Sequence, residues 1–442
     1  MADPLEGKTA EIPGSQSVST KRQRIADLAQ QAPSMSFTSL HHHIDMTWMR
    51  EAYRQTRKSG AAGVDGQSAG EFAEQLEENL QRLLEQLRSG QYRAPPVRRH
   101  FIPKAGKSNG LRPIGIPTFA DKVLQRAVSM VLESIYEQDF LDCSYGFRTG
   151  RSAHHALQSL WDGVMPMGGA YVVELDIRQF FDNLQFGHLR DFLRQRVRDG
   201  VLLRAVGKWL NAGVMEEGQL HRPKAGSPQG GVISPILANL YLHHVLDLWF
   251  EHEVRPRMRG KAFMVRYADD ALLVFRREDD ARRVLRALPK RFARYGLELH
   301  PEKTKLVRFK PVGGESFEFL GFTHVWSRSR RGRYYVKRRT ARSRLARGVQ
   351  SLSMWCRRNR HRPVREQHAQ LVLKLRGHYA YYGITGNMEG LKRFYVAGKR
   401  VWRKWLDRRN RERRMDWETF TRLLARYPLP KPRVVHSVYA TT

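Results

Sequence analysis

The period of apolar and polar positions changes several times along the chain. A helical spacing begins at Met46, and residues 121–136 carry an apolar stripe repeating every three to four residues, which predicts a buried helix. Residues 171–177 (YVVELDI) are mostly apolar, interrupted only by Glu174 and Asp176, which predicts a buried strand. Further helices are expected over residues 71–89, 187–211, 232–250 and 278–295.

Other segments read as strands, loops or tail. FMVRYADDALLVF (263–275) is two apolar runs around a polar pair, which predicts a β-hairpin. Prolines at 95, 96 and 103 forbid helix and predict extended chain. Short strands are expected within 297–309 and 317–322, and the remainder should be mostly helical. The polar residues 1–36 predict a flexible tail with a short helix at 21–31. Mixed helices and strands indicate an α/β fold of two or three domains.

The charge points to a polyanionic partner. The 442 residues include 78 Lys and Arg against 43 Asp and Glu, a net charge of +35. This excess predicts binding to nucleic acid or to an anionic membrane. No signal-peptide pattern or uncharged membrane-spanning run is visible. Cys143 and Cys356 form no CxxC motif, which excludes a disulfide scaffold and a Cys-rich zinc domain and fits a reducing, cytoplasmic location.

Most of the excess charge lies at the C-terminal end. Residues 321–442 hold 32 Lys and Arg against 6 Asp and Glu. Aromatic residues are interleaved with them, and aromatic faces can stack on bases while guanidinium groups neutralise phosphates: Tyr334, Tyr335, Trp355, Tyr379, Tyr381 and Tyr382. A solvated basic helix face is the alternative. A membrane-surface helix is disfavoured because the charges are not confined to one face.

The candidate chemistry centres on Tyr267-Ala268-Asp269-Asp270 at the tip of the hairpin. Two adjacent carboxylates among apolar residues are costly, and a divalent cation removes the cost. An exposed turn is the alternative for this pair alone. Asp176 strengthens the metal interpretation, because it shares a strand face with Glu174 and pairing with the hairpin would bring it beside Asp269. Two metals about 3.5–4 Å apart could then activate a primer 3′-oxygen.

Weaker candidates surround this centre. Phe180 and Phe181 follow Asp176 closely, where a nucleotide sugar could rest. Gln229 lies in GSPQGG (226–231), whose glycines permit close approach by a ligand. Lys104 and Arg112 flank a glycine-containing loop and could clamp a triphosphate, with ordinary surface charge as the alternative.

Three further groups are given structural roles. Successive histidines at 41–43 point in different directions, which disfavours a metal site. His154 and His155 open a helix, where packing or RNA contact is favoured over catalysis. Trp402 and Trp405 are expected to lie in a helix core.

The motifs, taken in order, resemble the group II intron-encoded reverse transcriptases, the reverse transcriptase/maturase proteins. Similarity runs from about Phe37 to Phe322, and the more specific blocks are SYGFRTGRSAH and GSPQGGVISPILANLYLH. The other matching blocks are FTSLHHHIDMTWMREAY, GAAGVDG, APPVRRHFIPK, LRPIGIPTFADKVLQRAV, VELDIRQFFDN, RYADD, LELHPEKTKL and FEFLGFTH. GHYAYYG, VWRKWLDRR and PLPKPR look like the family's thumb/maturase segment.

The resemblance implies a right-hand polymerase with an α+β palm. Its expected parts are a tail (1–36), fingers (37–165), a palm (166–320, with 185–230 partly in the fingers) and a basic helical thumb/maturase domain (321–442). It implies catalytic, metal-binding aspartates at 176, 269 and 270, with Ile177 added to the metal set. Substrate contacts are implied for Lys104, Arg112, Phe181 and Gln229.

The same resemblance implies cofactors and partners. The cofactors would be two Mg²⁺ ions, with Mn²⁺ as a substitute. The partners would be intron and template RNA, a DNA primer or target, and dNTPs, with no membrane.

Other functions stay open. An HNH endonuclease is not expected because no Cys follows Cys356, and a ribonuclease H domain is not expected because the last six acidic residues are scattered. The first alternative is an RNA-binding splicing cofactor without polymerase activity. The presence of all three aspartates, 176, 269 and 270, argues against it. The second is a stand-alone reverse transcriptase recruited to defence or repair. A basic DNA-binding module would not explain the palm motifs.

Overall fold

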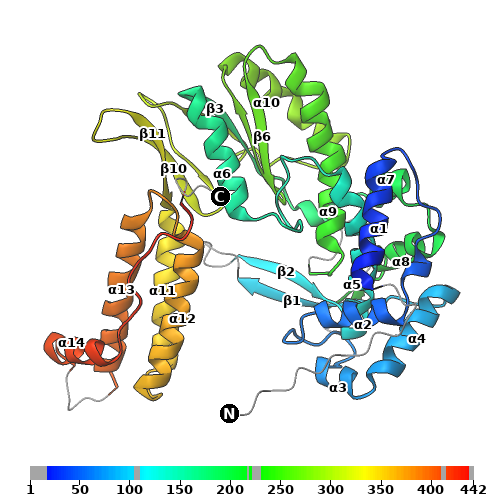
Figure 1. The fold of residues 1–442 in the computed structure, drawn as a ribbon, viewed down its shortest axis with the longest axis horizontal. Coiled ribbons are helices and arrows are strands. Elements are labelled where there is room, and N and C mark those ends of the chain that lie inside the picture. Colours follow the sequence, from blue (N-terminus) through cyan, green and yellow to red (C-terminus); the bar gives the residue numbers. More distant parts are fainter. Residues whose placement is uncertain (1–16, 104–109, 217–218, 222–229, 410–414, 438–442) are drawn as a thin grey trace.

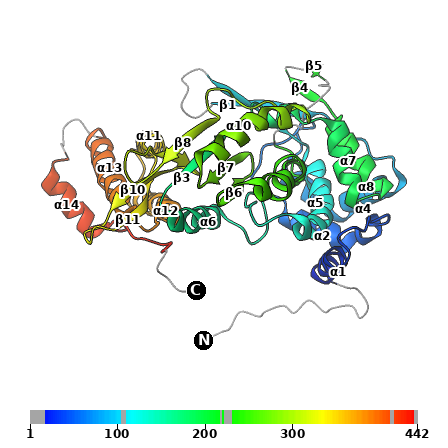
Figure 2. The same ribbon diagram turned by 90° about the horizontal axis from the view of Figure 1, so that it is seen from above.

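The computed structural model describes residues 17–103, 110–216, 219–221, 230–409 and 415–437 (Figures 1 and 2). In both views the antiparallel sheet that contains β3 and β6 lies between two helical regions. Helices α11–α14 form one end of the molecule, and α1–α5 with α7 and α8 form the other. The protein is therefore mixed helix and sheet, as the sequence predicts. Within the described part of the chain, no helix is long and apolar enough to cross a membrane.

The N-terminal helices surround α5, most of whose residues are buried. The central helix α5 spans Phe119–Asp139. The helices around it are α1 (Val18–Gln31), the short η1 (His41–His43), α2 (Met46–Gln55), α3 (Ala69–Glu74), α4 (Leu76–Ser89), α7 (Phe186–Arg196) and α8 (Gly200–Leu210). Ser17 caps α1, and Ile25 and Ala29 are buried where α1 packs along α5. The helix expected at 21–31 is therefore confirmed, and it begins three residues earlier. The flexible tail expected around it is wrong for residues 17–31, because a few apolar side chains suffice to dock this mostly polar helix.

Two expected helices are interrupted. The helix expected over 71–89 breaks at Gln75, after a Ser68 capping box has started α3. The helix expected over 187–211 breaks before Asp199, whose carboxylate accepts the backbone N–H groups of Val201 and Leu202 and starts α8.

The helix expected over 232–250 changes its winding instead of breaking. It begins as α9 (Ser234–Leu242) and continues as two π-helical turns, η4 (His243–Asp247) and η5 (Trp249–Val254). A short turn, η6 (Arg255–Arg257), follows.

The central sheet has the order β6 (Ala262–Tyr267), β7 (Asp270–Phe275), β3 (Ala170–Leu175), β8 (Lys305–Phe309), and every pair is antiparallel. One face, with Val173 and Leu273, joins the large core made with α5 and α9. The other face, with Val172 and Leu272, packs against α6 (Ala153–Val164). α10 (Glu278–Ala293) contacts β3 and β7. The short turns η2 (Met165–Met167) and η3 (Phe180–Asn183) precede and follow β3.

A second sheet has the order β2 (Leu111–Ile116), β1 (Val97–Pro103), β4 (Val214–Glu216), β5 (Gln219–His221). β1 and β2 form an antiparallel hairpin from Arg98–Ile116 to Pro103–Leu111. This confirms the extended chain predicted from the prolines. Figure 1 shows the hairpin reaching from the α5 region toward the side of α11 and α12.

The C-terminal region begins with three strands, of which the sequence analysis expected only the first, within residues 317–322. β9 (Phe317–Phe319), β10 (Phe322–Arg328) and β11 (Tyr334–Thr340) form a three-stranded sheet. The expectation of a mostly helical segment is therefore wrong for residues 323–340, where β-branched and aromatic residues at 323–326 and 334–336 favour strands. Four helices follow: α11 (Arg342–Arg358), α12 (Val364–Tyr382), α13 (Met388–Asp407) and α14 (Trp417–Arg426). Their own core contains Leu352, Leu371, Trp402 and Phe420.

Candidate active site

The Asp269-Asp270 pair sits where β6 turns into β7. Tyr267 and Asp270 are the last paired residues, so Ala268 and Asp269 form a two-residue loop. Ala268 has φ +57°, a left-handed conformation that L-residues rarely adopt and that tight hairpin turns require. The predicted hairpin is confirmed, and its geometry places Asp269 at the tip and Asp270 at the first position of β7.

Asp176 comes to this turn through the pairing of β3 with β7. The last register pair is Leu175–Ala271, so Asp176 follows one position beyond it, next to Asp270. Both aspartates and Glu174 line one cavity of about 630 Å³. The shared face of Glu174 and Asp176 is therefore confirmed. The predicted neighbour was Asp269, and the register places Asp270 there instead.

The aspartates at this edge influence one another. The carboxyl group of Asp270 is surrounded by protein atoms although the residue is exposed toward the cavity. Partial loss of hydration, followed by the negative charges of Asp269 and Asp176, raises the pKa of Asp270 to about 6. The positive charges of Arg344 and Lys303 oppose this shift. At this edge of the sheet the negative charges of the aspartates therefore outweigh the nearby positive charges.

Lys303 partly neutralises this negative charge. Its Nζ lies 3.1 Å from Oδ2 of Asp176, and both side chains are more than a third exposed. An exposed pair of this kind contributes little to stability, on the order of 0–1 kcal/mol. A cation of higher charge could therefore displace the lysine at small cost.

The donor chemistry fits an incomplete magnesium site. Among the residues that the structure describes, no three His, Cys, Asp or Glu side chains converge closely enough to hold an ion by themselves. Mg²⁺ is commonly bound through one or two carboxylates together with substrate phosphates and water. Asp176 and Asp270 meet that requirement. Ile177 has a buried apolar side chain and forms a bridge with Leu299, so only its carbonyl oxygen could take part.

The remaining predicted substrate contacts are placed unevenly. Phe181 lies half-buried in η3, with its ring centroid 5.3 Å from that of Phe180. Arg112 pairs with Ile102 through the backbone of the β1–β2 hairpin. Lys104 and Gln229 fall outside the described residues.

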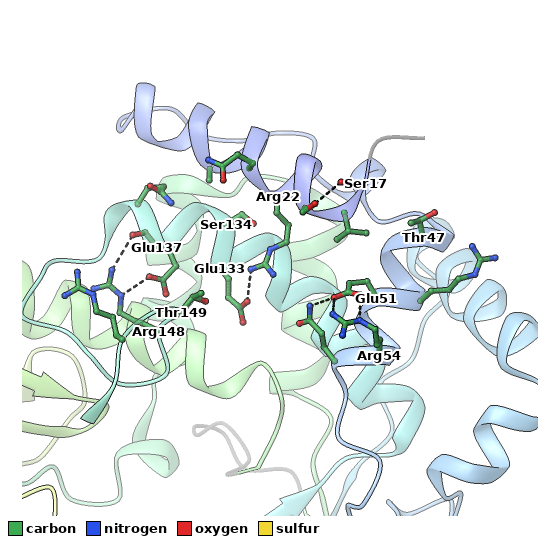
Figure 3. Close-up of a pocket in the computed structure, with 18 residues that line it drawn as sticks. Ser17, Arg22, Thr47, Glu51, Arg54, Glu133, Ser134, Glu137, Arg148 and Thr149 are labelled. Atoms are coloured by element: carbon green, nitrogen blue, oxygen red, sulfur yellow. Dashed lines mark hydrogen bonds and ion pairs between the residues drawn. The ribbon is translucent and has the colours of Figure 1, made fainter. Parts of the chain in front are cut away.

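A larger cavity, of about 1010 Å³, lies between α1, α2, α5 and the loop at Arg148 (Figure 3). Several of its guanidinium groups are paired with carboxylates that line the same cavity. Arg22 bonds Glu133 at 3.3 Å, and Arg148 bonds Glu137 at 3.0 Å. None of the predicted aspartates lines it, so the carboxylate edge at β3 and β7 remains the candidate active site.

The SYGFR segment (144–148) packs against the turn at Ala268. Arg266 of β6 exchanges backbone hydrogen bonds with Cys143 and Tyr145, at 2.7 and 2.8 Å. A Cβ atom built on Gly146 would lie 2.3 Å from the backbone nitrogen of Ala268. Glycine at 146 is therefore what allows this segment to lie against the Ala268 turn.

We expect Gly146→Ala to displace Ala268 or the SYGFR loop, because both contacts are backbone. Overpacking of this kind costs about 1–3 kcal/mol, and a shift of about 1 Å at reacting groups can lower turnover about 10²-fold. The measurement is primer extension per folded molecule. Gly187→Ala is the matched control, since a Cβ there meets nothing within 4 Å. Equal activity of the two variants would contradict the expectation.

The other sequence candidates have local partners. His41 Nδ1 lies 2.9 Å from Oδ2 of Asp199. His154 stacks on His436 with ring centroids 3.5 Å apart, which is a packing role. Both cysteines are buried and free, as expected.

The two tryptophans of α13 differ from each other. Trp402 is fully buried, which confirms the prediction of a core residue. Trp405 is half-buried and packs against the edge of the same core, so the prediction holds for it only in part. Its ring lies within 6 Å of three cationic side chains, those of Arg357, Lys404 and Arg408.

Comparison with known proteins decides the family. The model of the family described as "Reverse transcriptase (RNA-dependent DNA polymerase)" matches residues 102–324, which include the three aspartates. The chain belongs to the reverse transcriptase family. Protein YkfC of Escherichia coli K12 is 33% identical to this reverse transcriptase in an alignment of 360 residues that covers 72% of this chain and 91% of that protein.

Several relatives of this reverse transcriptase carry intron names. The group II intron-encoded protein LtrA of Lactococcus lactis is 36% identical over 249 residues, 53% of this chain and 40% of that protein. Nuclear intron maturase 4 of Arabidopsis thaliana is 30% identical over 149 residues, 33% of this chain and 18% of that protein. The resemblance to group II intron reverse transcriptases is confirmed. The matched part spans most of YkfC but less than half of LtrA.

Proposed function

We propose that this reverse transcriptase extends a primer 3′-OH with dNTPs on an RNA template, and that it also binds intron RNA to assist splicing and retromobility. The observation that carries the polymerase proposal is the meeting of Asp176 and Asp270 in one cavity, with Asp269 at the adjoining turn. Several acidic side chains lie together at this sheet edge, and nearby cations do not fully neutralise them. Such an arrangement can bind metal–nucleotide complexes.

The three aspartates would hold two Mg²⁺ ions, with Mn²⁺ as a substitute. Such ions lower the pKa of the primer hydroxyl and stabilise charge on the pyrophosphate leaving group. The protein supplies the placement: β3 and β7 hold Asp176 and Asp270 side by side through backbone pairing, and the tight turn orients Asp269. A further part for the carbonyl of Ile177 belongs to the same proposal.

Substrate selection is proposed for residues around this edge. Phe181 would lie against the sugar and sense its 2′ position, since its ring is half-buried and held by Phe180. Lys104 and Arg112 would bind the triphosphate, and Gln229 the nucleotide or template. β1 and β2 would carry the triphosphate contacts to the site.

We propose the domain division expected from the family. Fingers would span 37–165, the palm 166–320, and the thumb/maturase domain 321–442, with α1 packed on the fingers. The thumb would hold RNA through cations that lie beside aromatic rings. Examples are Lys374 over Trp355, Lys399 over Tyr395 and Arg403 over Trp417.

Primer extension tests the proposal. We expect the protein to extend a DNA primer on an RNA template with dNTPs and Mg²⁺, and a chelator to stop it. Mn²⁺ should restore part of the activity. RNA binding without any incorporation would overturn the polymerase proposal and favour the splicing-cofactor alternative.

A further inference from the structure

Next to the turn at Ala268 and Asp269 lies a buried ion pair. Arg266 is the first residue of the RYADD block, but the sequence analysis gave neither it nor its partner a role. Arg266 of β6 and Asp247 of η4 are both fully buried. Nε of Arg266 donates to Oδ1 of Asp247 at 2.7 Å, and Nη2 donates to Oδ2 at 2.5 Å. A two-point pair of this kind fixes the plane of the guanidinium group as well as its position.

The third nitrogen of the guanidinium group reaches the turn. Nη1 of Arg266 donates to the carbonyl oxygen of Ala268 at 3.0 Å and to Oδ1 of Asn239 at 2.9 Å. Nδ2 of Asn239 in turn donates to the carbonyl oxygen of Gly146 at 2.7 Å. One buried guanidinium group therefore ties the turn, through Asn239, to the glycine that packs against it.

Among the residues that the structure describes, Asp247 has no second cation within hydrogen-bond distance. His243 Nδ1 lies 3.9 Å away, beyond hydrogen-bond distance, and burial beside Arg266 and Arg148 lowers the pKa of His243 to about 3. The histidine is therefore neutral. The π-helical winding of η4 is the local feature that carries Asp247, and π-helical turns occur often at functional sites.

Resting on the proposed polymerase function, we propose that Arg266 is a positioning residue for nucleotidyl transfer. Held by Asp247, it fixes the Ala268 carbonyl, and with it the left-handed Ala268 conformation that aims Asp269. Asn239 extends the same hold to Gly146. A buried pair made only for stability would not need the two bonds to Ala268 and Asn239, and such pairs add little net stability over apolar replacements.

The test is Arg266→Lys, which keeps the charge but cannot hold Asp247 at two points and also reach Ala268. We expect kcat for primer extension to fall about 10–100-fold per active molecule, with the KM for dNTP and the RNA Kd changed less than about threefold. The Mg²⁺ concentration for half-maximal activity should rise. Without any metal, amide hydrogen exchange should accelerate over residues 267–271.

The matched control is Arg196→Lys. Arg196 is also buried, bonds Asp139 at 2.9 Å and donates to backbone carbonyls including that of Ala29, but it lies between α7 and α1. This control should lose stability while keeping kcat and the Mg²⁺ midpoint. A kcat loss equal to that of Arg266→Lys, or wild-type kcat in Arg266→Lys, would overturn the positioning role.

If Arg266→Lys does not fold, Asn239→Ala decides the question. It leaves the ion pair with Asp247 intact and removes the bond that Asn239 accepts from Arg266 together with the bond that it donates to Gly146. A lower kcat with unchanged KM supports the proposal, and wild-type kcat overturns it. Failure of the wild-type protein to extend a primer would instead count against the proposed function. Amide hydrogen exchange over residues 267–271 would still show whether Arg266 stabilises the conformation of the turn.

Discussion

We expect Asp269→Asn to reduce primer extension by about 10³-fold or more while RNA affinity stays within about twofold of wild type. Asparagine keeps the shape of the turn but removes a negative charge that the proposed metal ions require. A 10³-fold loss corresponds to about 4 kcal/mol of transition-state stabilisation. The measurement is single-turnover extension with saturating dNTP, beside an RNA-binding titration.

The matched control for this expectation is Asp279→Asn. Asp279 is exposed at the start of α10 and forms a surface pair with Arg277. Loss of its charge should leave extension and RNA binding unchanged. Extension by Asp269→Asn at more than a tenth of the wild-type rate would remove Asp269 from the metal-binding set.

The second large effect concerns RNA. A variant with four exposed basic residues of α11 and α12 replaced by Gln should bind RNA at least about tenfold more weakly: Arg357, Arg358, Arg365 and Arg376. Exposed ion pairs are worth about 0.2–1 kcal/mol each. For single-stranded RNA, each lost phosphate contact lowers the slope of log affinity against log salt by about 0.7, so four should lower it by about 3. The measurement is binding across a salt series.

An equal loss of charge elsewhere gives the control. Arg276, Arg277, Arg282 and Arg286 are exposed at and along α10, and their replacement by Gln removes the same four charges. If affinity depended on net charge alone, the two variants would weaken binding equally. That result would contradict a specific RNA surface on the C-terminal helices. A slope that does not change in the α11–α12 variant would contradict it as well.

Several features could be read from the sequence because their causes are local. The hairpin at residues 263–275 was predicted because two apolar runs flank a polar pair. The shared face of Glu174 and Asp176 followed from the alternation of side chains along a strand. The motif order also identified the family.

Other features needed the tertiary structure because they depend on distant segments. The neighbour of Asp176 is set by the register of β3 against β7, and a shift by one position exchanges Asp269 for Asp270. The docking of α1 depends on the surface of α5, which lies about a hundred residues later in the chain. The pairing of β10 with β11 was missed because the many basic residues over 328–339 gave the segment a polar pattern, which obscured the β-forming residues at 322–326 and 334–336.

The sequence by itself therefore determined which residues carry the candidate chemistry and on which strand face they lie, since both follow from residue type and local alternation. A lone Arg266 in an apolar strand and a lone Asp247 in an apolar helix were visible signals of buried charge that needs a partner. Only the tertiary structure decided that they are each other's partner and that the guanidinium group also holds Ala268. Such pairing depends on packing between segments that are distant in sequence or differ in local structure, and side-chain periodicity carries no information about it.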